Sequence, residues 1–470
     1  MRRILLAIAV AVFNGGCAHE PGEVILETAQ SSVSYRVGDG EVRPWGLDPS
    51  LNPDVLEAPI PADERRDVCF ISEIEEACFT LGVGEARDFV ILSGGVRHNT
   101  RILGVPDIPA AVFSPAYQAA HRGRTLVLVP EVYELVNIAI AITPYVAENP
   151  NFIVSDTEYY ADVVEHFGGM REHALVRALD ADMRADLFLY FRQKMNAYSF
   201  EFDSNGTIVQ SAVYNRTGFS GDRTNTLTRH FAAMQSFADE SGFRAFYAAH
   251  REFYESQISY LRDHADTAGI TDWLQGNFPD VRAYDGVKII FSPLVGSNQS
   301  LTTFNYDGYR ELQPHVNFPY RGTVGLSPEA EALSRATILF TEMNHGFIGE
   351  PAEAMRADVE AALGERAFWA DDEKAARTYS TELALFNEYM NWGLVSLYHY
   401  DRMSAADLAV SRAAVEQAMV ERRGFRQFAP FNAFLLEAYA NRAEGQTLAD
   451  LYPAIVAWFA AHEAAAGEAP

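Results

Sequence analysis

The segment Thr337-Ile-Leu-Phe-Thr-Glu-Met-Asn-His-Gly-Phe-Ile348 carries the clearest chemical signal in this chain. It has the composition of an apolar helix that contains one carboxylate and one imidazole. Residues three apart share a face of a helix, so Glu342 and His345 are expected side by side. This spacing matches the second half of His-Glu-x-x-His, the helix of zinc metallopeptidases. Thr341 stands where that motif has its first histidine.

The start of this helix is marked by Ser327-Pro328-Glu329, which supplies a cap, a proline at the first helical position and an early acid. We expect one helix that runs toward Phe347 and ends near Gly349 and Pro351. Glu342 and His345 then lie in its last turns. An alternative role for His345 is a hydrogen bond to the last carbonyls of the helix.

A second helix is expected from Arg377 to Tyr398, and it is mostly apolar apart from Asn387, Glu388 and Asn391. Burying an unpaired carboxylate is costly, so Glu388 needs a partner. Zinc peptidases use three protein ligands and an open position, and a glutamate acts as general base on the zinc-bound water. By this pattern Glu342 is the general base, and His345 and Glu388 are zinc ligands.

The substitution at Thr341 leaves three interpretations open, because a neutral hydroxyl is a poor zinc ligand. A histidine from elsewhere completes the site, with His315 the nearest candidate and His399 a weaker one. A harder ion binds through the two glutamates and carbonyl oxygens. In the third interpretation no metal binds, and Glu342, His345 and Glu388 form a hydrogen-bonded polar cluster.

The pattern of apolar residues predicts an α-rich α+β fold. Strands are expected at 24–37, 68–81, 89–103 and 286–295, with Pro293 limiting the last of these to a sheet edge or a strand end. Residues 296–320 are expected to form a long loop. Further helices are expected at 131–142, 157–179, 182–198, 228–265, 405–422 and 431–461. The expected organisation is a signal segment (1–17), a β-rich N-terminal subdomain (18–110) and a mainly helical domain (111–470).

The formal net charge is −27, which opposes binding to phosphate backbones and argues against a nucleic-acid partner. The chain has three lysines, Lys194, Lys288 and Lys374. Beyond the signal segment, Cys69 and Cys78 form a pair within a predicted hairpin. In an exported protein such a pair favours a disulfide, the alternative being two buried thiols.

The N-terminus is typical of an export signal, with Arg2 and Arg3 before the apolar run 4–13. Gly15 and Gly16 precede Cys17, the arrangement of an acylated lipoprotein cysteine, although Asn14 is unusual at its position. An ordinary cleaved signal is the alternative. We therefore expect a periplasmic protein or a lipoprotein attached to the outer membrane, whose membrane contact is a lipid anchor at Cys17.

Four short segments, 130–138, 291–295, 340–347 and 386–390, together resemble an uncharacterised family of exported bacterial proteins with a zincin-like core. The resemblance covers most of the chain from Leu126 onward. It implies a gluzincin-like fold, a zinc cofactor held by His345 and Glu388, and Glu342 as catalytic base. The implied function is a metal-dependent hydrolase acting on a peptide or protein substrate in the cell envelope, in which Thr341 in place of the first histidine would mark a degenerate site. The alternative is a non-catalytic lipoprotein or binding protein on the same fold.

Overall fold

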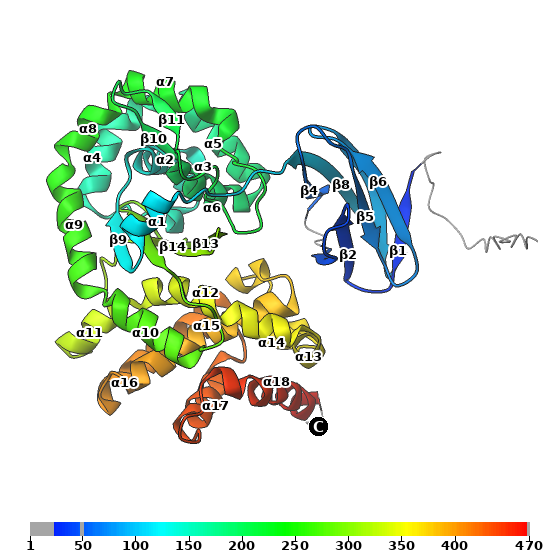
Figure 1. The fold of residues 1–470 in the computed structure, drawn as a ribbon. Helices are drawn as coiled ribbons and strands as arrows, with labels where there is room; N and C mark the ends of the chain where they lie inside the picture. Colours follow the sequence, from blue (N-terminus) through cyan, green and yellow to red (C-terminus); the bar gives the residue numbers. More distant parts are fainter. Residues whose placement is uncertain (1–22, 48–50, 468–470) are drawn as a thin grey trace, which may run out of the picture. The chain divides into compact units, whose positions relative to one another are not determined.

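The computed structural model describes residues 23–47 and 51–467 and divides the chain into two compact units, residues 1–107 and 108–470. The expected signal segment with Cys17 lies outside the described residues. The α-rich α+β class is confirmed, as is the β-rich N-terminal part (Figure 1). In the described part of the chain, no helix combines the length and apolarity that crossing a membrane requires.

The N-terminal unit contains two four-stranded sheets that share one apolar core. Phe70 from one sheet and Phe89 from the other have ring centroids 4.8 Å apart. The first sheet has the order β1-β7-β8-β4, formed by Ile25–Thr28, Ala86–Ser93, Val96–Pro106 and Asp54–Ile60. The second has the order β3-β2-β5-β6, formed by Arg43–Gly46, Ser32–Val37, Arg66–Ile71 and Glu76–Leu81.

The expected single strand at 24–37 is wrong, because β1 and β2 are separate strands in different sheets. The chain turns between them. Thr28 Oγ1 accepts a hydrogen bond from the Gln30 backbone N–H at 3.0 Å, and the Glu73 carboxylate accepts one from the Ala29 N–H at 2.6 Å. These polar contacts satisfy the backbone at the turn and direct the following strand into the second sheet.

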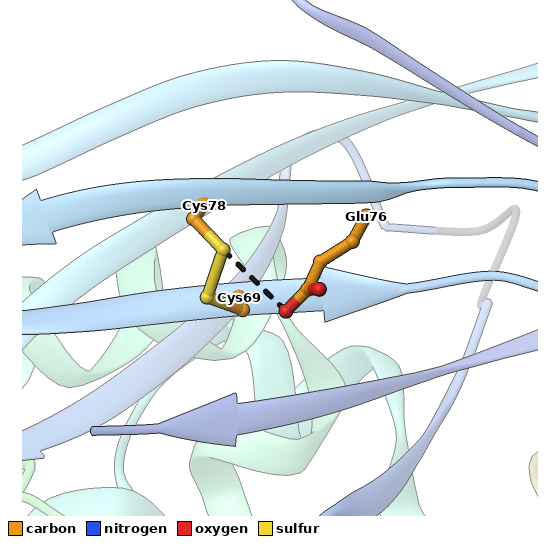
Figure 2. Close-up of side chains that lie close together, drawn as sticks. All are labelled: Cys69, Glu76 and Cys78. Atoms are coloured by element: carbon orange, nitrogen blue, oxygen red, sulfur yellow. Dashed lines mark hydrogen bonds between the residues drawn. A yellow bond between two sulfur atoms is a disulfide. The ribbon is translucent and has the colours of Figure 1, made fainter. Parts of the chain in front are cut away.

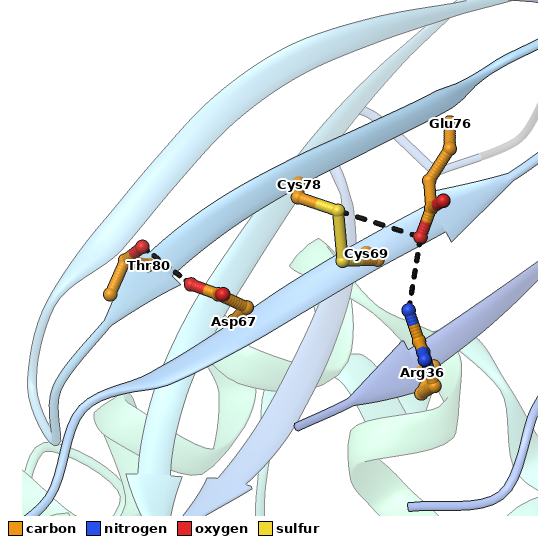
Figure 3. Close-up of a disulfide and its surroundings, with 6 residues drawn as sticks. All are labelled: Arg36, Asp67, Cys69, Glu76, Cys78 and Thr80. Atoms are coloured by element: carbon orange, nitrogen blue, oxygen red, sulfur yellow. Dashed lines mark hydrogen bonds and ion pairs between the residues drawn. A yellow bond between two sulfur atoms is a disulfide. The ribbon is translucent and has the colours of Figure 1, made fainter. Parts of the chain in front are cut away.

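The predicted hairpin at 68–81 is present as β5 and β6, and the Cys69–Cys78 disulfide joins two residues that lie directly opposite each other in the pair. Figure 2 shows Glu76 beside this bond, with Oε1 3.5 Å from Cys78 Sγ. A disulfide sulfur carries no proton to donate, so this is a close contact rather than a hydrogen bond. Figure 3 shows that the same carboxylate pairs with Arg36 at 3.2 Å. The disulfide therefore links β5 to β6 covalently, beside the ion pair of Glu76 and Arg36.

The second unit is built around a sheet of order β13-β14-β12-β9, formed by Ser300–Tyr306, Tyr309–Asn317, Gly286–Ser292 and Arg124–Leu128. The last three strands are parallel, and the edge strand β13 is antiparallel to β14. Every residue of β12 is buried. This strand ends at Ser292, directly before Pro293, so the predicted strand end is confirmed.

The expected long loop at 296–320 is wrong, because it contains the hairpin β13–β14. Two features of β14 make it difficult to recognise as a strand from the sequence. It buries the polar side chains Glu311, Gln313 and His315, and it contains Pro314, which cannot donate to a ladder. On β12, Val287 pairs with Leu312 and Ile290 pairs with His315, and the residues between them are unpaired in this strand pair. The interruption of the pairing therefore coincides with Pro314.

Helices lie on both sides of this sheet, and Figure 1 shows β13 and β14 between α2, α5 and α6 and the pair α12 and α15. The ring of His315 on β14 lies 5.6 Å from that of Tyr133 on α2, whereas Leu312 on β14 packs close to Gly346 on α12. In chain order the earlier helices are α1 Pro115–His121, α2 Glu131–Ala141, α3 Pro144–Glu148, α4 Glu158–Phe167, α5 Ala174–Ala185, α6 Leu187–Asn196, α7 Phe231–Ser241, α8 Phe243–Ala249, α9 Arg251–His264 and α10 Thr267–Asn277, the last of which packs against α12. The later helices are α11 Pro328–Arg335, α12 Thr337–Ala354, α13 Arg356–Ala362, α14 Arg366–Trp369, α15 Glu382–Tyr400, α16 Ala405–Gln417, α17 Phe428–Ala440 and α18 Tyr452–Gly467.

The helix cap at Ser327 is confirmed, but the boundaries predicted for this helix are wrong. One helix ends at Arg335, and α12 continues through Pro351 to Ala354. Pro351 removes the N–H that would bind Phe347 O, and tyrosine hydroxyls bind the carbonyls on either side of it: Tyr284 donates to Gly346 O at 3.0 Å and Tyr452 to Ile348 O at 3.2 Å. The Glu342–His345 pair therefore lies in the middle of α12, so His345 does not cap a helix end.

Candidate functional site

The structure brings two of the three predicted site residues into direct proximity. α12 and α15 pack against each other, and His345 Nε2 lies 3.7 Å from Glu388 Oε2. Glu388 is 2% exposed and Glu342 is 8% exposed, whereas the His345 side chain is 33% exposed. The pair is therefore anchored in the protein interior, and the imidazole is the part of it that reaches solvent.

Glu388 has a cationic partner that the sequence analysis did not identify. Arg423 donates to Glu388 Oε1 at 2.6 Å, and the Trp392 indole N–H donates to the same oxygen at 2.9 Å. Burial alone would raise the pKa of Glu388, but the charge of Arg423 and the hydrogen bonds from Arg423 and Tyr379 outweigh it and the pKa is lowered. Glu388 is therefore ionised at neutral pH, with its charge compensated by a guanidinium.

An amide group lies between the imidazole and the carboxylate. Asn391 Nδ2 is 2.9 Å from His345 Nε2 and 3.4 Å from Glu388 Oε2. Its Oδ1 accepts a hydrogen bond from Asn344 Nδ2 at 3.1 Å, which fixes the orientation of the amide. His345 Nε2 is the acceptor in this arrangement, so the imidazole carries its proton on Nδ1. Burial also lowers the pKa of His345, and both observations indicate a neutral ring.

Glu342 is in a different protonation state from Glu388. Burial and the nearby charge of Glu388 raise the pKa of Glu342 to about 8, partly opposed by Lys194 and Arg423. Burial lowers the pKa of Lys194 to about 7. Thr341 Oγ1 donates to Ile338 O at 2.8 Å. Because the pKa of Glu342 is about 8, its carboxyl is protonated in most molecules at neutral pH.

The residues present supply two donors for a zinc ion but not three. Two ligands about 2.1 Å from a tetrahedral zinc are separated by about 3.4 Å, close to the separation of His345 Nε2 and Glu388 Oε2. Within the ranges that the structure describes, the one group of three ligand side chains found to converge is Cys69, Glu76 and Cys78, whose sulfurs are joined in a disulfide. The side chains around Glu388 therefore do not fit a three-ligand zinc site.

The two histidines considered as additional ligands lie elsewhere. His315 is a strand residue rather than a loop residue, and it faces Tyr133 on α2, on the side of β14 away from Leu312 and α12. Burial and the charge of Lys194 hold its pKa well below the usual range. His399 Nδ1 is 2.7 Å from Ser411 Oγ, so it is bound within the packing of α15 against α16. Neither completes a ligand set with His345.

The residues that complete the cluster carried weak sequence signals. Asn391 interrupts the apolar pattern of its helix, and that interruption is now explained by its contact with His345. Lys194 could have been singled out because lysine is so rare in this chain. Arg423 follows Glu388 by a whole helix and is one of many arginines, and nothing local in the sequence marks it as the partner.

Comparison of the chain with protein-family models, curated proteins and solved structures returned no match. The function of the chain is therefore inferred from the geometry of the site.

Proposed function

We propose that this chain is a non-catalytic binding protein of the cell envelope, built on a zincin-like frame whose metal site has been replaced by a hydrogen-bonded cluster. The observation that carries the proposal is the position of Asn391. Its amide nitrogen bridges His345 and Glu388, the two side chains that a zinc ion would otherwise bridge. The proposal includes export, a lipid anchor at Cys17, and a peptide or protein as the bound partner.

The charges of the cluster support this proposal. The negative charge of Glu388 is balanced by Arg423, the carboxyl of Glu342 is mostly protonated, and His345 is neutral. A zinc ion is held mainly by ligands that bring negative charge or free lone pairs to it. Here the carboxylate is already neutralised and the imidazole lone pair already accepts a hydrogen bond. A dication would have to displace two existing partners before it could bind.

A metal-dependent hydrolase is the second candidate, favoured by the separation of 3.7 Å between His345 Nε2 and Glu388 Oε2. In that candidate His345 and Glu388 would hold zinc, which would supply an activated water for attack on a peptide bond. Glu342 would hold or release a proton beside it, and a pKa of about 8 suits a general acid or base near neutral pH. It requires a third ligand and a movement of the Asn391 amide.

The test is the metal content of the purified mature chain after incubation with zinc, measured by mass spectrometry beside Thr341→His, His345→Ala and Glu388→Ala. The binding-protein proposal predicts far less than one equivalent of zinc in the parent chain. It also predicts a gain in zinc when Thr341→His is combined with Asn391→Ala, since that variant restores a histidine and removes the bridging amide. Circular dichroism checks that each variant is folded.

The opposite result is equally specific. About one equivalent of zinc in the parent chain, the load of a single three-ligand site, lost in both His345→Ala and Glu388→Ala, would refute the binding-protein proposal. Peptide cleavage that is lost in Glu342→Gln while the zinc content stays unchanged would then establish the hydrolase.

A further inference from the structure

The second unit contains a pocket of about 380 Å³ that shares no residue with the Glu388 cluster. This volume lies within the range of about 300–1,000 Å³ that is typical of small-molecule sites. Its lining comes from α1, the start of α2, the short strands β10 (Phe200–Phe202) and β11 (Ile208–Gln210) with the residues that follow them, α8 and β12. These elements are far apart in the sequence, so the pocket exists only in the folded protein.

Lys288 on β12 lines this pocket although it is 6% exposed. Its Nζ lies 4.8 Å from the ring centroid of Tyr117, 5.0 Å from that of Tyr214 and 5.8 Å from that of Tyr198. Three aromatic rings therefore surround the ammonium group and stabilise its charge by cation–π contacts. Burying a lysine in this way is expensive, so the position calls for an explanation beyond packing.

The Lys288 ammonium group has N–H donors that make no hydrogen bond to a described residue. Lysine has three N–H donors. Among the described residues, the hydrogen-bond acceptor of Lys288 is the hydroxyl of Tyr214 at 2.8 Å. Glu311 is 4.0 Å away, beyond hydrogen-bond distance. Two N–H groups therefore remain for an acceptor that enters the pocket.

Glu311 does not compete for these donors, because its oxygens are engaged elsewhere. Tyr117 donates to Glu311 Oε2 at 2.5 Å, Tyr214 donates to Oε1, and Gln313 Nε2 lies 3.3 Å from Oε1. The carboxylate compensates the lysine charge at a distance, while the tyrosines satisfy its lone pairs. Burial lowers the pKa of Lys288, and the charge of Glu311 opposes this shift without occupying the remaining N–H donors.

The rest of the pocket combines apolar side chains with two carboxylates. Phe200, Phe202, Val132 and Val213 line it beside Glu131 and Glu201. Arg244 lies at the wall, 3.6 Å from Glu131, whose charge it compensates, and with its guanidinium 5.2 Å from the ring centroid of Phe202. A ligand with one polar end and one aromatic or branched aliphatic end matches this division. The polar end must offer two acceptors to one ammonium group, which is the property of a carboxylate.

We infer that this pocket binds a small monocarboxylate with an aromatic or branched aliphatic body, its carboxylate on Lys288 and its apolar end against the wall formed by Phe200, Phe202 and Val213. The ligand class follows from the two unused donors, the aromatic cage and the apolar lining. The site is independent of whether the Glu388 cluster binds a metal.

The test uses 3-phenylpropanoate as the probe and 3-phenylpropanamide as its neutral counterpart, with binding to the full mature chain measured by titration calorimetry. The acid should bind and the amide should bind at least about 10-fold more weakly, because a hydrogen bond to a charged group is lost. Lys288→Met should weaken binding of the acid by about 10- to 100-fold, because it also removes the hydrogen bond between charged groups. Lys374→Met removes the same charge from outside the pocket and should bind like the parent.

Val213→Trp keeps Lys288 and its partners and fills the apolar end, so it tests the site even where Lys288→Met does not fold. Loss of acid binding in this variant supports the inference. The inference is overturned by equal binding of acid and amide, by acid binding that survives both variants, or by no binding of the acid to the parent chain.

Discussion

Breaking the ion pair between Arg423 and Glu388 should be far more costly than breaking an ion pair of the same length at the surface. Arg423→Met removes a guanidinium 2.6 Å from a carboxylate that is 2% exposed. A buried charge left without its partner costs about 3–5 kcal/mol. Because the Arg423 side chain is itself 23% exposed, we expect a loss of about 3 kcal/mol in the free energy of unfolding at pH 8.

A matched control is provided by Arg356, which lies 2.7 Å from Glu353 with side chains that are 33% and 54% exposed. Arg356→Met should cost at most about 1 kcal/mol, because exposed pairs gain little from their attraction. The two pairs differ by a tenth of an ångström in length, but the carboxylate is 2% exposed in one pair and 54% exposed in the other. Arg356 also pairs with Glu360 at 3.0 Å, so the control loses two exposed pairs and should still cost less than Arg423→Met.

The assay is urea denaturation followed by tryptophan fluorescence. Of the five tryptophans in the chain, Trp45 alone belongs to the N-terminal unit, so the signal reports mainly the unit that contains the site. A shift of the midpoint at constant slope measures the change in stability. In the double variant Arg423→Met, Glu388→Gln, removal of the stranded charge should recover part of the loss. Equal losses for the two arginines, or no recovery in the double variant, would refute the reasoning.

Two further predictions concern other parts of the chain. Burial raises the pKa of Glu134 from 4.5 to about 7, so the folded state holds a proton that the unfolded state releases. Its stabilising contribution is complete below pH 4.5 and is lost as the pH rises through about 7, a change of about 3 kcal/mol. Unfolding measured from pH 4 to 8 should therefore show Glu134→Gln gaining stability relative to the parent as the pH rises, and a constant difference would contradict this. Replacing both Cys69 and Cys78 by alanine should lower the free energy of unfolding by about 3 kcal/mol, the value expected for so short a closed loop. Thermal unfolding should then show a lower midpoint for the N-terminal unit, and an unchanged midpoint would contradict this prediction.

The sequence was sufficient for features that depend on local pattern. The sequence pattern identified the segments that form β5 to β8 in the first unit but not β3 or β4. The Ser327 cap was found from three residues because capping is a local interaction. The helix end was misplaced because α12 continues through Pro351, beside which tyrosines distant in the sequence donate to Gly346 O and Ile348 O. The strand β14 was missed because it buries polar residues, and the tyrosines that bind its buried carboxylate Glu311 lie far from it in the sequence.

The same division applies to the site. The sequence by itself determined that Glu342 and His345 share a helix face and that Glu388, in an apolar helix, needs a partner. Only the tertiary structure decided which partner that is: a guanidinium from Arg423, with the Asn391 amide beside His345. The physical reason is that the protonation and metal affinity of a buried group depend on charges within a few ångströms in space, and folding brings those charges together from positions that are distant along the chain.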